Sequence, residues 1–417
     1  MLSKMSIMKR KLKADLILIN GIAVIAYVFL FLQLDLRSGT ELMLVTSDSK
    51  TYMAVADWMS GGVAGYEVCI RPVLYPLFML TASLFGGYSA IWIIQAVFWL
   101  LTVNISFYVI KMMCRSTFLA TIGGLTVALN FSLMSLTFFG LTEILATFLL
   151  SILVLLVVRN KNRYNEIRFA HLALGLLTLL TLTRPVFSIP LYTFLVVVIL
   201  IYHGKKYIRK PVLVLIPILI LLPAFIQMTI VQSHCGKFTI STVGELAFKN
   251  YLFAQGLEKT ENVSREESQK LADSYSKKER DQIFSSNKSL YSGLFIKNVL
   301  TNITEYPAML YYREGKSKLT IIRRFMKTYN KVTIWVHLFS GILMTLLLIV
   351  FIKERKYDEL IQSGSLALLL IYLLVTTGIS FSQGDRLVIS TLVIWVSLYL
   401  FVIQQLLDRL KGQPRTR

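Results

Sequence analysis

The sequence predicts an all-α polytopic membrane protein with about ten transmembrane helices. Of its 417 residues, 55% are hydrophobic and only 16% are charged, and the mean hydropathy is +0.63. A soluble protein of this length does not carry so apolar a composition. Apolar runs close to the ~20 residues that cross ~30 Å of hydrocarbon recur along the chain.

Ten apolar segments are interpreted as spans, and an even number places both termini on one side of the membrane. A further apolar segment, 73–86, is expected to lie in or dip into the outer leaflet. An eleventh crossing there would place Lys111 and Arg115 outside and invert the basic loops that follow. The ten expected spans cover residues 15–33, 88–110, 117–135, 141–158, 170–183, 186–202, 211–231, 333–352, 363–381 and 387–407.

Lys and Arg are divided unevenly between the two sides that these spans define. The expected cytoplasmic segments hold 22 of them, whereas the short outer segments hold five, namely Arg37, Lys50, Arg71, Arg184 and Arg386. This bias predicts a plasma-membrane protein with both termini in the cytoplasm. The net charge of +21 then reflects contact with anionic membrane lipids rather than with nucleic acid. The expected cytoplasmic segments are 1–14, 111–115, 159–168, 203–210, 353–359 and 408–417.

Three parts are expected along the chain. Residues 1–231 form an N-terminal transmembrane module whose first outer loop, 34–87, carries the candidate site. Residues 232–332 form the large hydrophilic outer loop, which is expected to act as a lid or a recognition surface. Residues 333–417 form the C-terminal transmembrane helices and a short cytoplasmic tail.

Local signals within 232–332 predict short elements. The stretch GKFTISTVGE favours a short extended segment and a turn. Ser264 followed by Glu267 fits a capping box that begins a polar helix reaching about Gln282. A second amphipathic stretch covers 290–304.

The first outer loop contains an amphipathic segment. Tyr52, Val55, Ala56 and Met59 recur at helical spacing and give one apolar face. Because no soluble core is expected nearby, this face predicts a helix lying in the membrane interface.

Asp48 is the leading candidate for acid–base chemistry. It follows the first span, where a carboxylate can meet a hydroxyl group presented from outside, and a positioned general base typically contributes about 10²–10⁴-fold to a rate. The alternative is that Ser47 or Asp48 caps a helix that begins near Ser49. Asp57 and Glu67 are secondary candidate acids.

Three arginines are candidate phosphate ligands. Arg71 and Arg184 each precede a proline at an expected outer boundary, and Arg386 opens the last span. Arginine forms bidentate, charge-assisted bonds to phosphate, and Arg184 leads because an ionisable residue between apolar runs points to function. The alternative is snorkelling to lipid headgroups. Glu143, at the outer boundary of the fourth span, is a further secondary acid, with an interface or cap role as its alternative.

Metal and disulfide signals are weak. The four histidines show no paired ligand spacing, and no paired-acid motif supports a divalent metal ion. No cofactor is therefore assigned, and metal dependence is left open. Cys69 and Cys235 share the expected outer side and could form a disulfide, although unpaired cysteines are the expectation.

Five pieces of the chain, taken in order, resemble the GT-C superfamily of integral-membrane glycosyltransferases. The resemblance is to the bacterial relatives of dolichyl-phosphate-mannose protein mannosyltransferases. Each piece is short, so their order and placement along nearly the whole chain are more specific than any one motif. The pieces are SDSKTYMAVADW, RPVLYPLFMLTASLFGG, LTEILATFLL, LTRPVFSIPL and GDRLVISTLVIW.

The resemblance implies a GT-C-like bundle with membrane-parallel helices in the first outer loop. It implies that Asp48 is the catalytic base of an inverting sugar transfer from a polyprenyl-phosphate donor, at the outer face, to a glycan, lipid or protein. Arg184 and Arg386, with Arg71, would hold the donor phosphate. The chain departs from the family where Ser49 replaces the second acid of an Asp-Glu pair found in many relatives.

Two other functions stay open on the sequence. One is a flippase or transporter of lipid-linked saccharides, and the other is a polymerase that joins lipid-linked repeat units. A transporter should carry charged residues deep within several spans. Here the ionisable candidates gather at the expected outer boundary, which favours a reaction at the interface.

Overall fold

The computed structural model describes residues 2–33, 45–305, 319–381 and 383–411, and the described residues form helices joined by turns, with no strand among them. The first half of the chain contains α1 (Leu2–Gln33), α2 (Ser47–Met59), α3 (Glu67–Ile70), α4 (Leu74–Ser83), α5 (Gly87–Cys114), α6 (Thr117–Ala128), α7 (Phe131–Leu136), α8 (Glu143–Arg159), α9 (Ile167–Thr183), α10 (Ser188–Phe194), α11 (Gly204–Arg209) and α12 (Leu215–Cys235). The second half contains α13 (Val243–Ala247), α14 (Ala254–Thr260), α15 (Arg265–Ser274), α16 (Lys277–Ser286), α17 (Lys288–Thr304), α18 (Leu319–Lys353), α19 (Tyr357–Thr376) and α20 (Leu392–Leu410).

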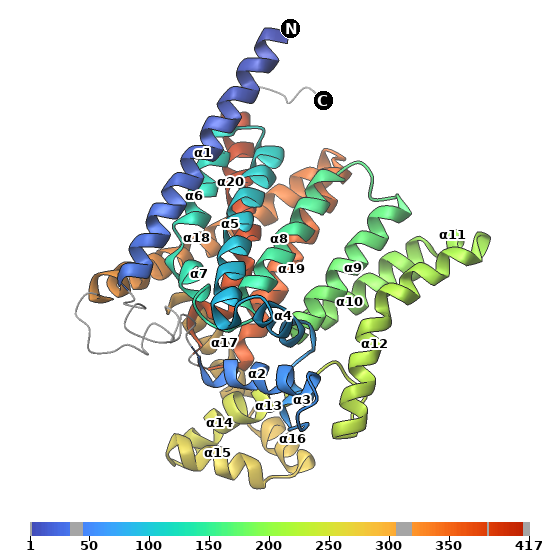
Figure 1. Cartoon of the computed structure of the whole chain (residues 1–417), viewed down its shortest axis with the longest axis vertical. Coiled ribbons are helices and arrows are strands. Elements are labelled where there is room, and N and C mark those ends of the chain that lie inside the picture. The colour runs from blue at the N-terminus through green and yellow to red at the C-terminus, as the bar shows by residue number, and fades with distance from the viewer. Residues whose placement is uncertain (1, 34–44, 306–318, 382, 412–417) are drawn as a thin grey trace.

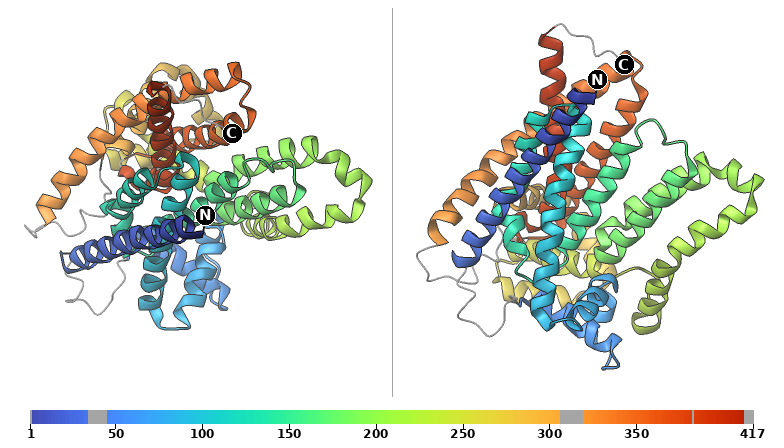
Figure 2. Two further views of the ribbon diagram at one scale, coloured as in Figure 1. Left: turned by 90° about the horizontal axis from the view of Figure 1, so that it is seen from above. Right: turned by 45° about the horizontal axis from the view of Figure 1, so that its top comes forward.

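A central bundle forms around α5, which packs against α1, α6, α8 and α20. The helices α9 to α12 extend from one side of this bundle, with α9 packed between α8 and α12 (Figures 1 and 2). The start of α1 and the end of α20 lie at one end of the bundle, whereas α2, α3 and α13 to α16 lie at the opposite end (Figure 1). Segments far apart in the sequence therefore meet at that second end.

Apolar side chains are exposed along several of the long helices. Leu219 and Phe225 of α12 are 64% and 58% exposed, and Trp335 of α18 is 72% exposed. Soluble monomers rarely expose large apolar bands of this kind. Among the described residues, six helical segments are long and apolar enough to cross a membrane: Lys13–Leu32, Ser89–Cys114, Pro185–Tyr202, Pro211–Cys235, Tyr357–Ile379 and Ile389–Leu410.

The remaining four of the ten expected spans are shorter or less uniformly apolar. The expected span 117–135 is interrupted, because α6 ends at Ala128 and the side chain of Asn130 accepts a hydrogen bond from Leu133 N–H to begin α7. The helices α8 and α9 have 17 residues each. The segment 73–86 contains only the ten-residue α4, which at about 1.5 Å per residue is too short to cross a membrane.

The amphipathic face of α2 is packed against other helices of the protein, so the expectation that this face contacts the membrane is wrong. Tyr52 and Val55 are 5% and 0% exposed, and α2 packs against α3 and α4. The ring of Tyr52 meets that of Tyr75 of α4 edge-on, with the ring centroids 5.1 Å apart. Other helices of the protein cover this face. The helical spacing of its apolar residues could not show whether protein or lipid would do so.

The described part of the connection between α12 and α18 is a helical insert, defined here as residues 236–305. No strand forms at its start: residues 236–242 are irregular, with bends at four positions, and lead into α13. The capping box of Ser264 and Glu267 is confirmed as the start of α15. That helix ends at Ser274 rather than near 282, because Ser276 and Glu279 form a second capping box that begins α16. The amphipathic stretch 290–304 is confirmed as α17.

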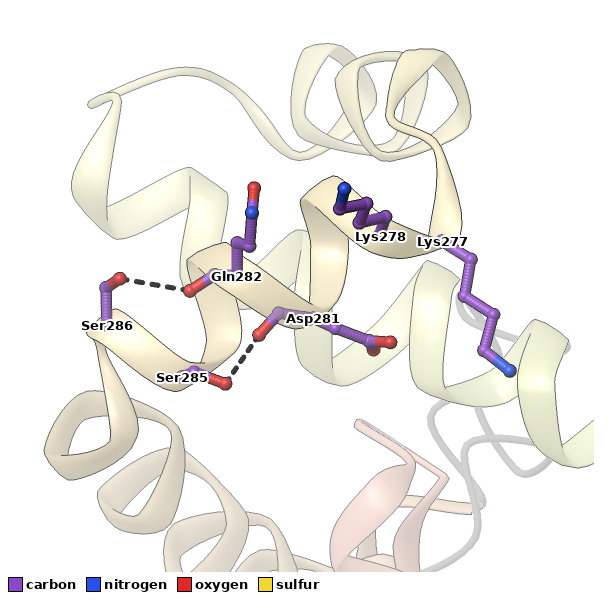
Figure 3. A pocket seen from close by; sticks show the side chains of 6 residues that line it. All are labelled: Lys277, Lys278, Asp281, Gln282, Ser285 and Ser286. Atoms are coloured by element: carbon purple, nitrogen blue, oxygen red, sulfur yellow. Dashed lines mark hydrogen bonds between the residues drawn. The ribbon is translucent and has the colours of Figure 1, made fainter.

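A small hydrophobic core of its own stabilises the helical insert. Its buried side chains are Leu252, Phe253, Ala254, Leu257, Ala272, Tyr291 and Leu294. On its surface, α16 lines an open hollow of about 660 Å³ with Lys277, Lys278 and Asp281 (Figure 3). Residues of one helix form that hollow, and none of them takes part in the ion pairs of the candidate site.

We predict that Gly256→Ala destabilises the helical insert. A methyl group at Gly256 of α14 would overlap the buried ring of Tyr291, and overpacking of a core typically costs about 1–3 kcal/mol. Gly293→Ala is the matched control, since Gly293 lies in α17 with no atom near its position, and a helical Gly→Ala change should stabilise by about 0.5–1 kcal/mol. Limited proteolysis of the insert measures both effects, and equal resistance of the two variants would contradict the prediction.

Candidate functional site

Asp48 bridges two arginines at the end of the bundle that carries α2 and the helical insert. Its Oδ1 lies 2.6 Å from Arg71 Nη2, and its Oδ2 lies 2.6 Å from Arg386 Nη2. The Asp48 side chain is 32% exposed, whereas those of Arg71 and Arg386 are 13% and 11% exposed. The carboxylate is therefore the accessible member of a largely buried ion-pair cluster.

The first turn of α2 presents the Asp48 carboxylate without using it as a cap. Thr46 is the N-cap: its Oγ1 accepts a hydrogen bond from Ser49 N–H, and Ser49 Oγ accepts one from Thr46 N–H. The alternative that Ser47 or Asp48 caps this helix is therefore wrong. Because the cap is satisfied by neighbours, the Asp48 carboxylate is available to the arginines.

Arg71 follows the short helix α3 and is oriented by three groups besides Asp48. Its Nε donates to Thr51 Oγ1 at 2.8 Å, and its Nη1 donates to the Tyr52 hydroxyl at 3.2 Å. The guanidinium carbon also lies 4.5 Å from the centroid of the Tyr52 ring, within cation–π range. All three nitrogens of Arg71 are therefore used in different directions.

Arg386 stands in the short turn Gly384–Leu387 and is paired with a second carboxyl group. Its Nε donates to Glu143 Oε1 at 2.5 Å, and its Nη1 donates to Gln383 Oε1 at 3.4 Å. Glu143, at the start of α8, is only 1% exposed. Its other oxygen, Oε2, has no hydrogen-bond partner among the described residues. The structure thus brings four of the sequence candidates together.

The charges of the cluster determine how Asp48 titrates. Burial alone would raise the pKa of Asp48, but the charges of Arg386 and Arg71 and their hydrogen bonds outweigh it and hold the pKa at about 2. Burial would lower the pKa of Arg386, yet Glu143 and Asp48 hold it above its ordinary value. Asp48 is therefore ionised at neutral pH, and it is a weak base as long as both arginines hold it.

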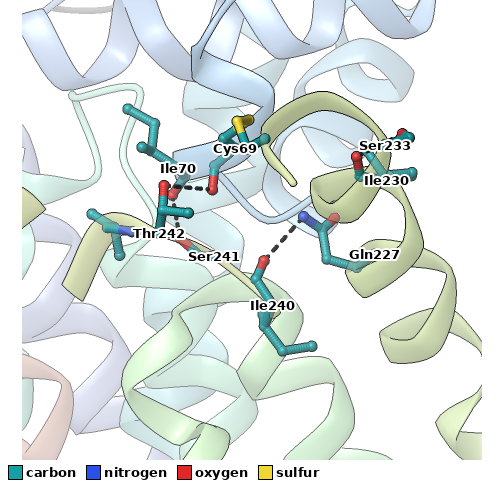
Figure 4. Close-up of a disulfide and its surroundings, with 10 residues drawn as sticks. Cys69, Ile70, Gln227, Ile230, Ser233, Ile240, Ser241 and Thr242 are labelled. Carbon is teal, nitrogen blue, oxygen red and sulfur yellow. Dashed lines mark hydrogen bonds between the residues drawn. A yellow bond between two sulfur atoms is a disulfide. The ribbon is translucent and has the colours of Figure 1, made fainter. Parts of the chain in front are cut away.

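A disulfide and three hydrogen bonds fix the segment that carries Arg71 (Figure 4). Cys69 of α3 is bonded to Cys235 at the end of α12, 166 residues later, so the expectation of unpaired cysteines is wrong at these two positions. Thr242 donates to Cys69 O through both its N–H and its hydroxyl, and Ser241 Oγ donates to Ile70 O at 2.8 Å. The fold brings these partners together, and the sequence spacing could not show it.

Gln227 of α12 connects the same segment to the helical insert. Its Oε1 accepts from Val73 N–H at 3.1 Å. Its Nε2 donates to Ile240 O at 3.1 Å, as Figure 4 shows. Gln227 is completely buried. Gln227 is not among the sequence candidates, although a lone amide inside an apolar run is itself a signal for an internal hydrogen bond.

Two asparagines of α17 fix the turn that carries Arg386. Asn302 donates to Thr377 O at 3.0 Å and to Ser380 O at 2.8 Å, and it accepts from Gln383 N–H. Asn298 donates to Gly378 O at 3.2 Å. Both asparagines are buried. Their spacing of four residues places them on one helical face, a signal that the amphipathic interpretation of 290–304 did not use.

The other sequence candidates lie outside the cluster. The Arg184 side chain is partly buried and has no hydrogen bond or ion pair within the described part of the chain, although its backbone N–H closes α9 on Leu180 O. Asp57 of α2 is exposed and Glu67 of α3 is partly buried, and neither carboxyl group forms an ion pair with a described residue. Their proposed roles stay predictions.

Metal-ligating side chains do not gather at this site. Across the described ranges, no group of three or more His, Cys, Asp or Glu side chains could hold a metal ion. The chemistry available from the cluster is therefore that of carboxylates and guanidinium groups: proton acceptance and the binding of an anion such as phosphate.

No protein-family model matches this chain, and no curated protein sequence matches it.

We predict that the unreduced, denatured protein contains a single cysteine that reacts with a maleimide. Cys69 and Cys235 form the disulfide, whereas Cys114 is buried and takes no part in it. Mass spectrometry should show one modification before reduction and three after it. Three modifications before reduction would contradict the disulfide.

Proposed function

We propose that this protein is an inverting glycosyltransferase that moves a sugar from a polyprenyl-phosphate donor to a glycan, lipid or protein acceptor. The observation that carries this proposal is the contact of Asp48 with both Arg71 and Arg386. It joins a proton acceptor to two phosphate-binding groups at one end of a bundle of apolar helices. The sequence resemblance to GT-C glycosyltransferases agrees with this combination of groups.

The reaction requires one proton acceptor and one anion site. The acceptor oxygen attacks the anomeric carbon, and the bond from that carbon to the phosphate oxygen breaks, with its electron pair leaving on the phosphate. Asp48 takes the acceptor proton. Arg71 and Arg386 stabilise the charge on the departing polyprenyl phosphate, and Glu143 orients Arg386 by accepting from its Nε. Arg184 is a further phosphate ligand in this proposal.

The site faces the outside of the plasma membrane in this proposal, and the chain crosses the membrane ten times. Both termini lie in the cytoplasm. Three observations support this arrangement. The excess of Lys and Arg on the expected cytoplasmic side agrees with this orientation. The start of α1 and the end of α20 lie at the opposite end of the bundle from α2 and α3 (Figure 1). The Cys69–Cys235 disulfide requires an oxidising compartment.

Sugar transfer is tested with purified protein and radiolabelled polyprenyl-phosphate sugars. We expect transfer of label to an acceptor fraction from the cell envelope, with release of polyprenyl phosphate. Asp48→Asn should abolish it, because the amide keeps the shape but cannot accept the proton. Full activity of this variant would remove Asp48 as the base. Turnover confined to diphosphate-linked saccharides would favour a polymerase, and movement of intact lipid across vesicles would favour a flippase.

We predict that Arg71→Lys impairs transfer at least tenfold. Lysine keeps the charge but cannot contact Thr51, Tyr52 and an anion at once, as the three nitrogens of Arg71 do. Arg184→Lys is the comparison, and we expect a smaller loss, because its side chain has no hydrogen bond or ion pair in the described structure that the substitution would also remove. The measurement is kcat/KM beside the yield of folded protein. A strong defect in Arg184→Lys with a mild one in Arg71→Lys would make Arg184 the main phosphate ligand.

We predict that position 270, in the helical insert, is outside the cell. Lys270→Cys in a Cys114→Ser background keeps the native disulfide and adds one exposed thiol. A membrane-impermeant maleimide should label it in intact cells. Lys411→Cys, at the other end of the bundle, should react only after permeabilisation. The reverse pattern would overturn the proposed orientation.

A further inference from the structure

We infer that Asp48 occupies the binding position of a phosphate group between Arg71 and Arg386, and that a phosphate-bearing ligand binds by exchange with it. The Asp48 carboxylate places one oxygen on each guanidinium group, both at 2.6 Å. A phosphate group can offer two oxygens to two guanidinium groups in the same way. The carboxylate is in this sense an internal substitute for the ligand.

The two arginines are held in place by groups other than Asp48. Thr51 and Tyr52 hold Arg71 through its Nε and Nη1, and Glu143 holds Arg386 through its Nε. Each guanidinium keeps these contacts when Asp48 leaves, so the pair is preorganised for an incoming anion. Because both side chains are nearly buried, an unpaired charge there is costly. This favours exchange with an anion over exchange with water or a neutral ligand.

Asp48 is the member of the cluster that can move. It has the most exposed side chain of the four, at 32%. Thr46 and Ser49 cap α2, so a change in the Asp48 side chain leaves the helix start intact. A displaced carboxylate also stays in the first turn of α2, where the helix dipole stabilises negative charge.

Exchange would couple donor binding to proton abstraction, and this consequence rests on the proposed function. While both arginines hold Asp48, its pKa is about 2 and it is a weak base. When the donor phosphate takes the arginines, the groups that depress the pKa of Asp48 are engaged elsewhere. The base then becomes effective only when a donor is bound, which predicts that donor binds before the acceptor is deprotonated.

The test is the affinity of the full-length purified protein for farnesyl phosphate, measured by calorimetry. Asp48→Asn should bind it about tenfold more tightly than the parent, because the competing carboxylate is gone. Asp57→Asn is the matched control on the same helix and should bind like the parent. Farnesol should not bind to the arginine pair. Equal or weaker binding by Asp48→Asn would overturn the exchange.

A second measurement covers the case in which Asp48→Asn folds poorly. Asp48→Ala leaves a gap between the arginines, so inorganic phosphate should raise its Tm more than it raises that of the parent. Adding Arg71→Gln should remove the difference. An equal rise in parent and Asp48→Ala would contradict the exchange. Tighter binding of farnesyl phosphate than of inorganic phosphate assigns the site to a lipid phosphate, and the opposite order assigns it to a free phosphate.

The exchange and the sugar transfer can fail separately. If Asp48→Asn binds phosphate more tightly but the parent transfers no sugar from any polyprenyl-phosphate donor, the exchange stands and the proposed function is wrong. If the parent transfers sugar while Asp48→Asn binds farnesyl phosphate no more tightly, the function stands and the exchange is wrong.

Discussion

The double contact of Asp48 is the interaction on which the arrangement of this end of the molecule depends. It joins α2, the residue after α3 and the turn before α20, the last of which lies 338 residues from Asp48. Arg71 and Arg386 are nearly buried, and removing one partner of a buried ion pair typically costs about 3–5 kcal/mol. The three segments are therefore stabilised together, and a ligand that replaced Asp48 would have to supply equivalent charge.

The helical insert forms hydrogen bonds to the backbone segments that carry Arg71 and Arg386. Ser241 and Thr242 bind the backbone beside Cys69, and Asn302 of α17 binds the turn that carries Arg386. The insert thus has a structural part in the site that does not depend on its expected action as a lid or acceptor surface. One insert therefore contacts both arginine-bearing segments and fixes their backbones relative to each other.

Local signals in the sequence were sufficient where a few neighbouring residues decide the outcome. The capping box at Ser264 and the amphipathic helix at 290–304 are examples, since both depend on side chains one turn apart. The same reasoning failed where a competing local signal intervened, as at Ser276, whose own capping box ends the preceding helix early. It also failed for the apolar face of α2, because periodicity shows that a face is buried but not whether lipid or protein covers it.

For the candidate site, the sequence by itself determined the residue types: an acid after the first apolar segment, arginines at expected outer boundaries and an acid at the start of α8. Which of them meet was decided by the tertiary structure, because pairing across 338 residues depends on how the helices pack. Packing selected Asp48, Arg71, Arg386 and Glu143 and left Arg184 without a side-chain partner in the described structure. It also paired Cys69 with Cys235. Composition and periodicity report the environment of each residue, whereas partners are set by the crossing of elements that only the folded chain brings together.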